Sequence, residues 1–89
     1  MKEIKVSSKT SSSQLSLSIV KAIDELEELD TVSVSCIGAG ALNQAAKAII
    51  SAKGKLYQKG ETLIMDMAFF DAVSESGEIQ GIRFIIRKV

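Results

Sequence analysis

The apolar residues of this chain recur with two different periods, and the change between them marks the elements. In "EIKV" the apolar Ile4 and Val6 alternate with Glu3 and Lys5, which predicts a short strand. Further along, apolar residues recur every three or four positions, which predicts an amphipathic helix of about four turns. This stripe comprises Leu15, Ile19, Ala22, Ile23, Leu26 and Leu29. Ser11 stands three positions before Gln14 in the capping-box form, so the helix should begin there.

Alternation returns in "TVSVSCI", where Val32, Val34 and Cys36 share one face of a predicted second strand. The segment "ALNQAAKAIISAK" then predicts a second helix, because small and apolar residues recur at 41, 45, 48, 49 and 52. We expect this helix to stop near Gly54, with Lys53 well placed in its last turn.

The last third of the chain predicts two strands joined by a turn at "SESG". In "TLIMDMAFF" one face carries Leu63, Met65, Met67 and Phe69, and the other carries Ile64, Asp66, Ala68 and Phe70. In "IQGIRFIIRKV" one face carries Ile82, Phe84 and Ile86, and the other carries Gly81, Arg83, Ile85 and Arg87. The closing pair should form an antiparallel hairpin.

The predicted order is therefore βαβαββ, in one domain spanning residues 1–89. Strand–helix–strand units favour parallel neighbours with right-handed crossovers, so we expect an α+β two-layer sandwich. Both helices should cover one face of a four-stranded mixed sheet. Domains this small are often helped by self-association, which predicts a homodimer or higher homo-oligomer. The alanine ridge of the second helix or an edge of the sheet should carry the contact.

Composition narrows the range of partners. The formal net charge is zero, which argues against a broad electrostatic grip on nucleic acid. The charges are unevenly spread, however: "DELEELD" is acidic, and we interpret it as a solvated face, whereas every charged residue from Lys47 to Lys59 is a lysine. There is no run of about 18 apolar residues that could span a membrane, and "MKEIKVSSKT" lacks the apolar core of a signal peptide. We therefore expect cytoplasmic residence and no membrane partner.

Catalytic chemistry has little support in the sequence. The chain has no histidine, so Ser-His-Asp and Cys-His arrangements are excluded. One cysteine and scattered carboxylates make no metal-ligand set, and no cofactor is predicted. Cys36 precedes a helix start and could be a nucleophile, but its strand position favours a buried thiol. Asp66 could be a catalytic carboxylate, but a sheet-edge or interface partner of Arg83 or Arg87 is the stronger interpretation. We expect a protein that is not an enzyme.

The stretch "CIGAGALNQ" is the main candidate site. A dinucleotide-binding fingerprint needs a further glycine at position 43, which is Asn, so that motif is incomplete. A strand, Gly-Ala-Gly and a helix start can instead present backbone N–H groups to an anion. The loop "SSKTSSS" should open the first helix at the same sheet edge. We call the two segments together the loop rim; its members are Ser8, Lys9, Thr10, Ser11, Gly38, Ala39, Gly40, Asn43 and Lys47. The alternative is that both segments are only tight turns, which would favour the same residue types without any bound anion.

The strings "KVSSKTSSS", "IGAGALNQAAKAI" and "AKG" closely resemble the stage V sporulation protein S family. The resemblance spans essentially the whole chain and implies an Alba-like fold and nucleic-acid binding. Archaeal Alba chromatin proteins are more distantly similar; they grip DNA through a lysine-bearing first loop, a second loop and the closing hairpin. By position, Lys9 matches the first loop and residues 38–43 the second. Gly-Ala-Gly replaces the arginines of Alba proteins, and this hairpin is acidic, with Asp71, Glu75 and Glu78.

Three functions are compatible with these observations. The resemblance favours a regulatory protein that binds DNA or RNA weakly, in a salt-dependent manner, through the loop rim. The neutral charge favours a dimeric scaffold in developmental regulation, or a sensor of a small phosphate-bearing ligand at the same rim.

Overall fold

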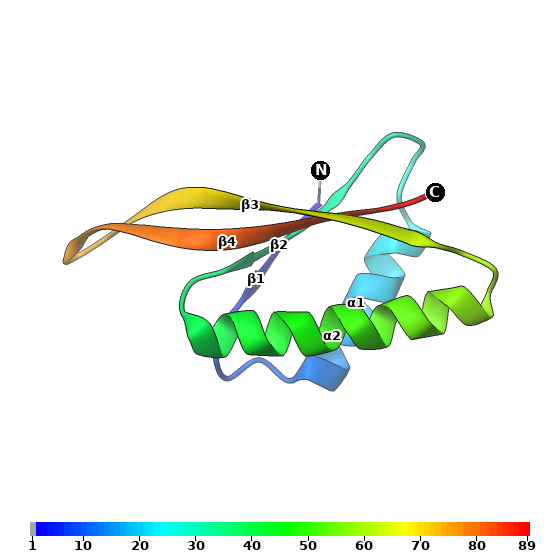
Figure 1. Ribbon diagram of the computed structural model, residues 1–89, viewed down its shortest axis with the longest axis horizontal. Coiled ribbons are helices and arrows are strands. Elements are labelled where there is room, and N and C mark those ends of the chain that lie inside the picture. Colours follow the sequence, from blue (N-terminus) through cyan, green and yellow to red (C-terminus); the bar gives the residue numbers. More distant parts are fainter. Residues whose placement is uncertain (1) are drawn as a thin grey trace.

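The computed structural model describes residues 2–89 and has the predicted element order. The elements are β1 (Lys2–Val6), α1 (Ser12–Asp24), β2 (Val32–Cys36), α2 (Ala39–Gln58), β3 (Leu63–Ser74) and β4 (Gly77–Lys88). Both helices lie on one side of the sheet, so the chain forms two layers (Figure 1). The predicted α+β two-layer fold is confirmed.

The sheet has the order β1-β2-β4-β3. β1 and β2 are parallel, and β4 pairs antiparallel with both β2 and β3. Because β1 and β2 are parallel neighbours, both strands end at the same edge of the sheet. The loops that follow Val6 and Cys36 therefore both leave from this edge, as the sequence predicted.

The core lies between the two helices and the helix-facing sides of β2 and β4. Val32, Val34 and Cys36 point into it from β2, and Phe84 and Ile86 from β4. The helices contribute Leu15, Ile19, Ala22, Ile23, Ala41, Ala45, Ala48, Ile49, Ala52 and Leu56. The four buried alanines of α2 let its axis approach α1 and the sheet closely, which is why the alanine ridge is buried inside one chain.

That burial corrects one expectation about self-association. Ala41, Ala45, Ala48 and Ala52 are at most 1% exposed within a single chain. The alanine ridge of the second helix therefore cannot carry a contact between copies, because it already packs against the chain's own sheet and α1.

The first helix is shorter than predicted. It ends at Asp24, with the N–H of Glu25 donating to the carbonyl of Lys21 at 3.1 Å. Leu26 still packs against the core, but Leu29 is 94% exposed, with φ of 70°. The chain needs residues 25–31 to cross back to the start of β2 beside Lys2, so the helical stripe cannot continue. Most of "DELEELD" consequently lies in this crossover loop.

The second helix is longer than predicted, because Gly54 lies inside it. The helix continues to Gln58, and Leu56 extends its buried stripe. Gly60 lies two residues beyond the helix end, and its φ of 81° is readily adopted by glycine. There the N–H of Gly60 donates to the carbonyl of Tyr57 at 2.9 Å, and the N–H of Glu61 to that of Leu56 at 3.0 Å.

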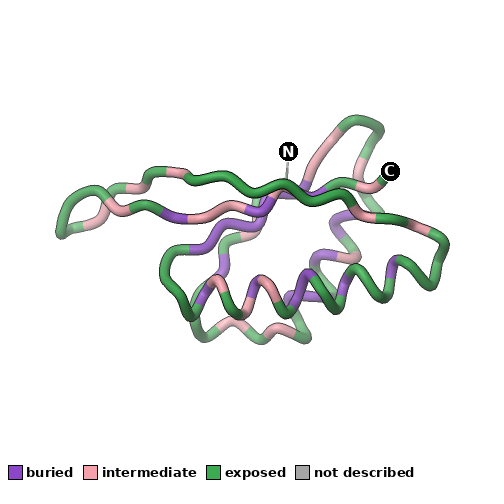
Figure 2. The backbone as a smooth tube through the Cα atoms, viewed as in Figure 1, coloured by how far each residue is buried: buried purple, intermediate pink, exposed green. Residues whose placement is uncertain are grey.

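The closing hairpin projects well beyond the helical layer (Figure 1). β3 and β4 have twelve residues each, whereas β1 and β2 have five. The helices leave β3 uncovered, so it is exposed along most of its length (Figure 2). No helix within residues 2–89 is both long and apolar enough to cross a membrane.

Candidate functional site

The two segments of the loop rim are in contact. A Cβ atom added to Gly40 would lie 2.7 Å from the Cβ of Ser8, so these residues touch across the sheet edge. Nearby, Nε2 of Gln44 donates to the carbonyl of Thr10 at 2.7 Å. The start of α2 is therefore fastened to the loop that follows β1, although the bonded residues are 34 positions apart.

The contact gives Gly40 a structural role. In the sequence interpretation, Gly-Ala-Gly is a segment that presents backbone N–H groups to an anion. At Gly40 the space above the backbone is instead filled by Ser8. Gly38 differs, because it has φ of 91° and nothing within 4 Å of the position that a Cβ would take, so its backbone conformation is what favours glycine there.

Several hydroxyls of the first loop are engaged by the loop itself. Oγ1 of Thr10 accepts a hydrogen bond from the N–H of Ser7 at 2.9 Å, and Oγ of Ser7 accepts from the N–H of Lys9 at 3.2 Å. Oγ of Ser11 caps α1 by accepting from the N–H of Gln14 at 3.3 Å. Thr10 and Ser11 therefore shape the loop, while Ser8 and Lys9 are exposed to solvent.

The start of α2 is open. Gly38 occupies the capping position without a side chain, so no side-chain oxygen caps this helix. Ala39, Gly40, Asn43 and Lys47 are all exposed. The first backbone N–H groups of a helix carry partial positive charge, which favours an anion in front of them.

A small cavity of about 180 Å³ lies beside this helix start. It is lined by Cys36, Gly38, Ala39 and Leu42 on one side and by Gln80, Gly81 and Ile82 of the hairpin on the other. The base of the hairpin therefore adjoins the loop rim. Glu75 and Glu78 are exposed farther out along the hairpin, whereas the exposed Asp71 pairs with Gln80 at its base.

Cys36 is buried, at 2% exposure. Burial raises the pKa of its thiol, because the charged thiolate is disfavoured away from water. The predicted inert thiol is therefore the interpretation that the structure supports. Among residues 2–89 no group of three or more His, Cys, Asp or Glu side chains could hold a metal ion.

A second polar cluster lies on the outer face of the sheet, which we define as the face opposite the helices. Arg83 of β4 directs Nη2 to Oε2 of Glu3 at 3.5 Å and Nε to Oγ of Ser35 at 3.4 Å, and its guanidinium lies 4.8 Å from the ring centroid of Phe70. Arg83 is therefore engaged by Glu3 and Ser35, and the partnership of Asp66 with Arg87 or with an interface stays a prediction. Asp66 accepts a hydrogen bond from the N–H of Met67 at 2.9 Å.

The sequence interpretation missed this cluster as a unit. Its members come from four strands, and only the register brings them together. The one signal in the sequence was Gly81, a glycine inside a predicted strand. Its register partner is Phe70, and a Cβ on Gly81 would lie 2.5 Å from the Phe70 ring. The ring therefore packs directly over the glycine.

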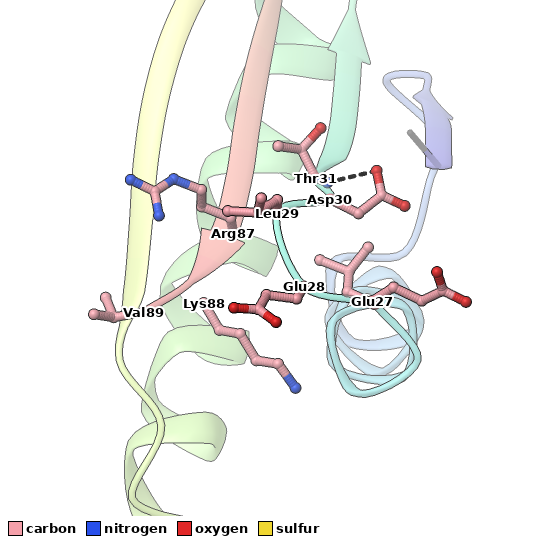
Figure 3. Close-up of a pocket in the computed structure, with 9 residues that line it drawn as sticks. Glu27, Glu28, Leu29, Asp30, Thr31, Arg87, Lys88 and Val89 are labelled. Carbon is pink, nitrogen blue, oxygen red and sulfur yellow. Dashed lines mark hydrogen bonds between the residues drawn. The ribbon is translucent and has the colours of Figure 1, made fainter.

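A larger hollow, of about 770 Å³, lies at the opposite end of the sheet (Figure 3). Its lining comes from the crossover loop after α1 and from the end of β4. It carries the carboxylates of Glu27, Glu28 and Asp30 beside Arg87 and Lys88. The N–H of Thr31 donates to Asp30 and lowers the pKa of that carboxyl, so it stays ionised. The surplus of acidic groups makes this hollow a poor place for a phosphate.

Comparison with known proteins shows the fold and the family of this chain. A solved structure with which this chain shares that fold is Alba from Thermoplasma volcanium, with a TM-score of 0.61 and 13% identity over 94% of each chain. A model of stage V sporulation protein S matches residues 2–89, and the chain belongs to that family.

Proposed function

We propose that this protein is a regulatory, non-enzymatic nucleic-acid-binding protein that holds a phosphate backbone at the loop rim. The contact between Ser8 and Gly40 is the observation that carries the proposal, because it joins a lysine-bearing loop to an open helix start. Lys9 and Lys47 supply full charges, and the first amides of α2 supply partial ones. Family membership supports the same interpretation.

The proposed binding is weak and depends on salt. Each neutralised phosphate contributes about −0.7 to the slope of log K against log salt for a single strand, and about −0.9 for a duplex. The rim has few cations, so we expect a slope on the order of −2 to −3. The acidic outer hairpin repels phosphate, which keeps the contact local to the rim.

The test is fluorescence anisotropy with labelled DNA and RNA oligomers at two salt concentrations. Lys9→Ala should weaken binding and reduce the slope by about one. Lys47→Ala should act in the same direction. Lys53→Ala removes the same charge from an exposed position farther along α2 and serves as the matched control, with wild-type binding expected.

Gly40 is a poor probe of binding, because any side chain there would displace Ser8. If Lys9→Ala and Lys47→Ala both bind like wild type, the rim is only a pair of turns and the scaffold function takes first place. Free nucleotides that bind as tightly as the oligomers would favour the phosphate sensor instead.

A second candidate function, a dimeric scaffold, is favoured by one observation. The helix-side face of β3 exposes Met65, Met67, Phe69 and Val73, and α2 exposes Ile50 and Tyr57. We name these six residues the uncovered face. A shallow hollow of about 130 Å³ lined by Met67, Ala68, Phe69 and Ile82 could receive an apolar side chain from a second copy.

The other route to a dimer, pairing of β3 edges, is disfavoured by Asp66. Its carboxylate already holds the N–H of Met67, so that donor is not available to another strand. A dimer through the uncovered face is compatible with nucleic-acid binding, because two rims in one particle would raise the apparent affinity.

A further inference from the structure

The polar cluster on the outer face, formed by Glu3, Ser35, Phe70 and Arg83, adjoins a cavity of about 290 Å³. The phosphate binding proposed for the loop rim does not use this cavity. Its lining includes Glu3, Lys5, Ser35, Ile37, Phe70 and Arg83. The cavity combines an aromatic ring, a guanidinium, an ammonium, a hydroxyl and an exposed apolar side chain. Ile37 is 45% exposed, although it immediately follows a fully buried strand.

The guanidinium of Arg83 is held in place before any ligand arrives. Glu3, Ser35 and the ring of Phe70 contact it from three directions. The two polar contacts use two of its five N–H donors. Oγ of Ser35 accepts from Nε of Arg83, so its own proton can be donated to a ligand. A planar group entering the cavity would therefore meet a preformed stack and a hydrogen-bond donor.

This cavity adjoins the loop rim. Lys5 and Val6 lead directly into the loop that contains Ser8 and Lys9, and Ile37 leads directly into Gly38. A strand of nucleic acid whose phosphates rest on the rim would therefore have its next base within reach of the outer face.

We propose that this cavity receives one unpaired base of a single-stranded nucleic acid, and that the protein prefers single strands to duplex. The inference rests on the proposed function, because it assumes that the rim holds the backbone. Phe70 and Arg83 stack against the base, Ile37 packs against its edge, and Lys5 contacts the adjacent phosphate. The lining of the cavity holds two cations, Lys5 and Arg83, and one carboxylate, Glu3. Its net positive charge therefore favours an anionic ligand.

The preference for single strands follows from geometry. In a duplex the faces of the bases are stacked on one another, and a protein reaches only their edges. A ring and a guanidinium that bind a base by its face require that base to be unstacked. The acidic hairpin also makes insertion into a duplex groove unfavourable.

The experiment compares three labelled or competing ligands: a deoxythymidine oligomer of about ten nucleotides, the same oligomer annealed to its complement, and inorganic polyphosphate, which has charge but no bases. Phe70→Leu keeps an apolar cover over Gly81 but removes the aromatic face. Ile64→Ala is the control, since it trims an exposed apolar side chain on the same face of the same strand, away from the cavity and from the uncovered face. Circular dichroism and sedimentation check that both variants keep the fold and oligomeric state.

We expect wild type to bind the single strand more tightly than the duplex. Phe70→Leu should lose roughly tenfold in affinity for the single strand, as expected when one stacked base is lost. The same variant should bind polyphosphate like wild type, whereas Lys9→Ala should weaken both. Ile64→Ala should change neither affinity.

The two failures are distinguishable. If wild type binds none of the three ligands, the proposed function falls and this inference falls with it. If Lys9→Ala weakens binding but Phe70→Leu binds the single strand like wild type, only the inference is overturned. Equal or tighter binding to the duplex overturns it as well.

Discussion

Cys36 illustrates what burial does to a single residue. Its position beside Val34 on the helix-facing side of β2 leaves it 2% exposed, and desolvation raises the pKa of the thiol. Its place just before a helix start would by itself favour a thiolate. Desolvation opposes that effect, so the side chain acts as a small apolar core residue.

We therefore predict that a thiol reagent such as DTNB labels Cys36 only through opening of the fold. Labelling in native buffer should be at least about 100-fold slower than in denaturant, because opening of a stable core is rare. Fast stoichiometric labelling of the native protein would contradict the burial. A Cys36→Ala variant gives the background rate.

The raised pKa also has a consequence for stability. Above the ordinary thiol pKa the unfolded chain loses this proton while the folded chain keeps it. The unfolded state then binds fewer protons, so the free energy of unfolding falls as pH rises through this range. The fall should be smaller in Cys36→Ala than in wild type when both are unfolded by urea.

At the scale of an element, α2 contains two glycines with opposite surroundings. Gly40 packs against Ser8, whereas Gly54 has nothing within 4 Å of the position that a Cβ would take. Both lie within the helix and neither has a positive φ. The same substitution at the two positions therefore separates packing from helix propensity.

We predict that Gly54→Ala raises the free energy of unfolding by about 0.5–1 kcal/mol, because alanine restricts the unfolded chain and favours the helix. Gly40→Ala should instead lower it by about 1–3 kcal/mol, because the added methyl overlaps Ser8. Urea unfolding at one protein concentration measures both. Equal effects at the two sites would show that Ser8 does not pack on α2.

At the scale of the whole molecule, the long hairpin leaves more apolar surface than the two helices can cover. The uncovered face is the result, and a small domain gains stability by burying such a surface against a second copy. Its composition, with two methionines and two aromatic rings, is typical of a contact surface.

We predict that Phe69→Glu dissociates the homodimer, because association would bury an unpaired carboxylate. Sedimentation at micromolar concentration should show wild type as a dimer and the variant at the 9.5 kDa of one chain. Leu17→Glu makes the same change at an exposed apolar residue of α1 and should leave the dimer intact. If the wild-type protein sediments as a monomer, the proposed scaffold function is contradicted.

The periodicity of the sequence was enough to predict the element order, the faces of β2 and β4, and the two loops that leave one sheet edge. These features depend on residues close together in the chain, whose spacing directly sets which side of an element is apolar. The helix ends were misplaced for a related reason. Leu29 continued the stripe locally, but the chain had to return to β2.

Only the tertiary structure decided how distant residues meet. Ser8 packs on Gly40, and Arg83 reaches Ser35 across 48 positions, because strand register and the packing of α2 bring them together. Neither contact leaves a periodic trace in the sequence. The same holds for the uncovered face: alternation placed Met67 and Phe69 on one face of β3, and the width of the helical layer decided that this face stays exposed there.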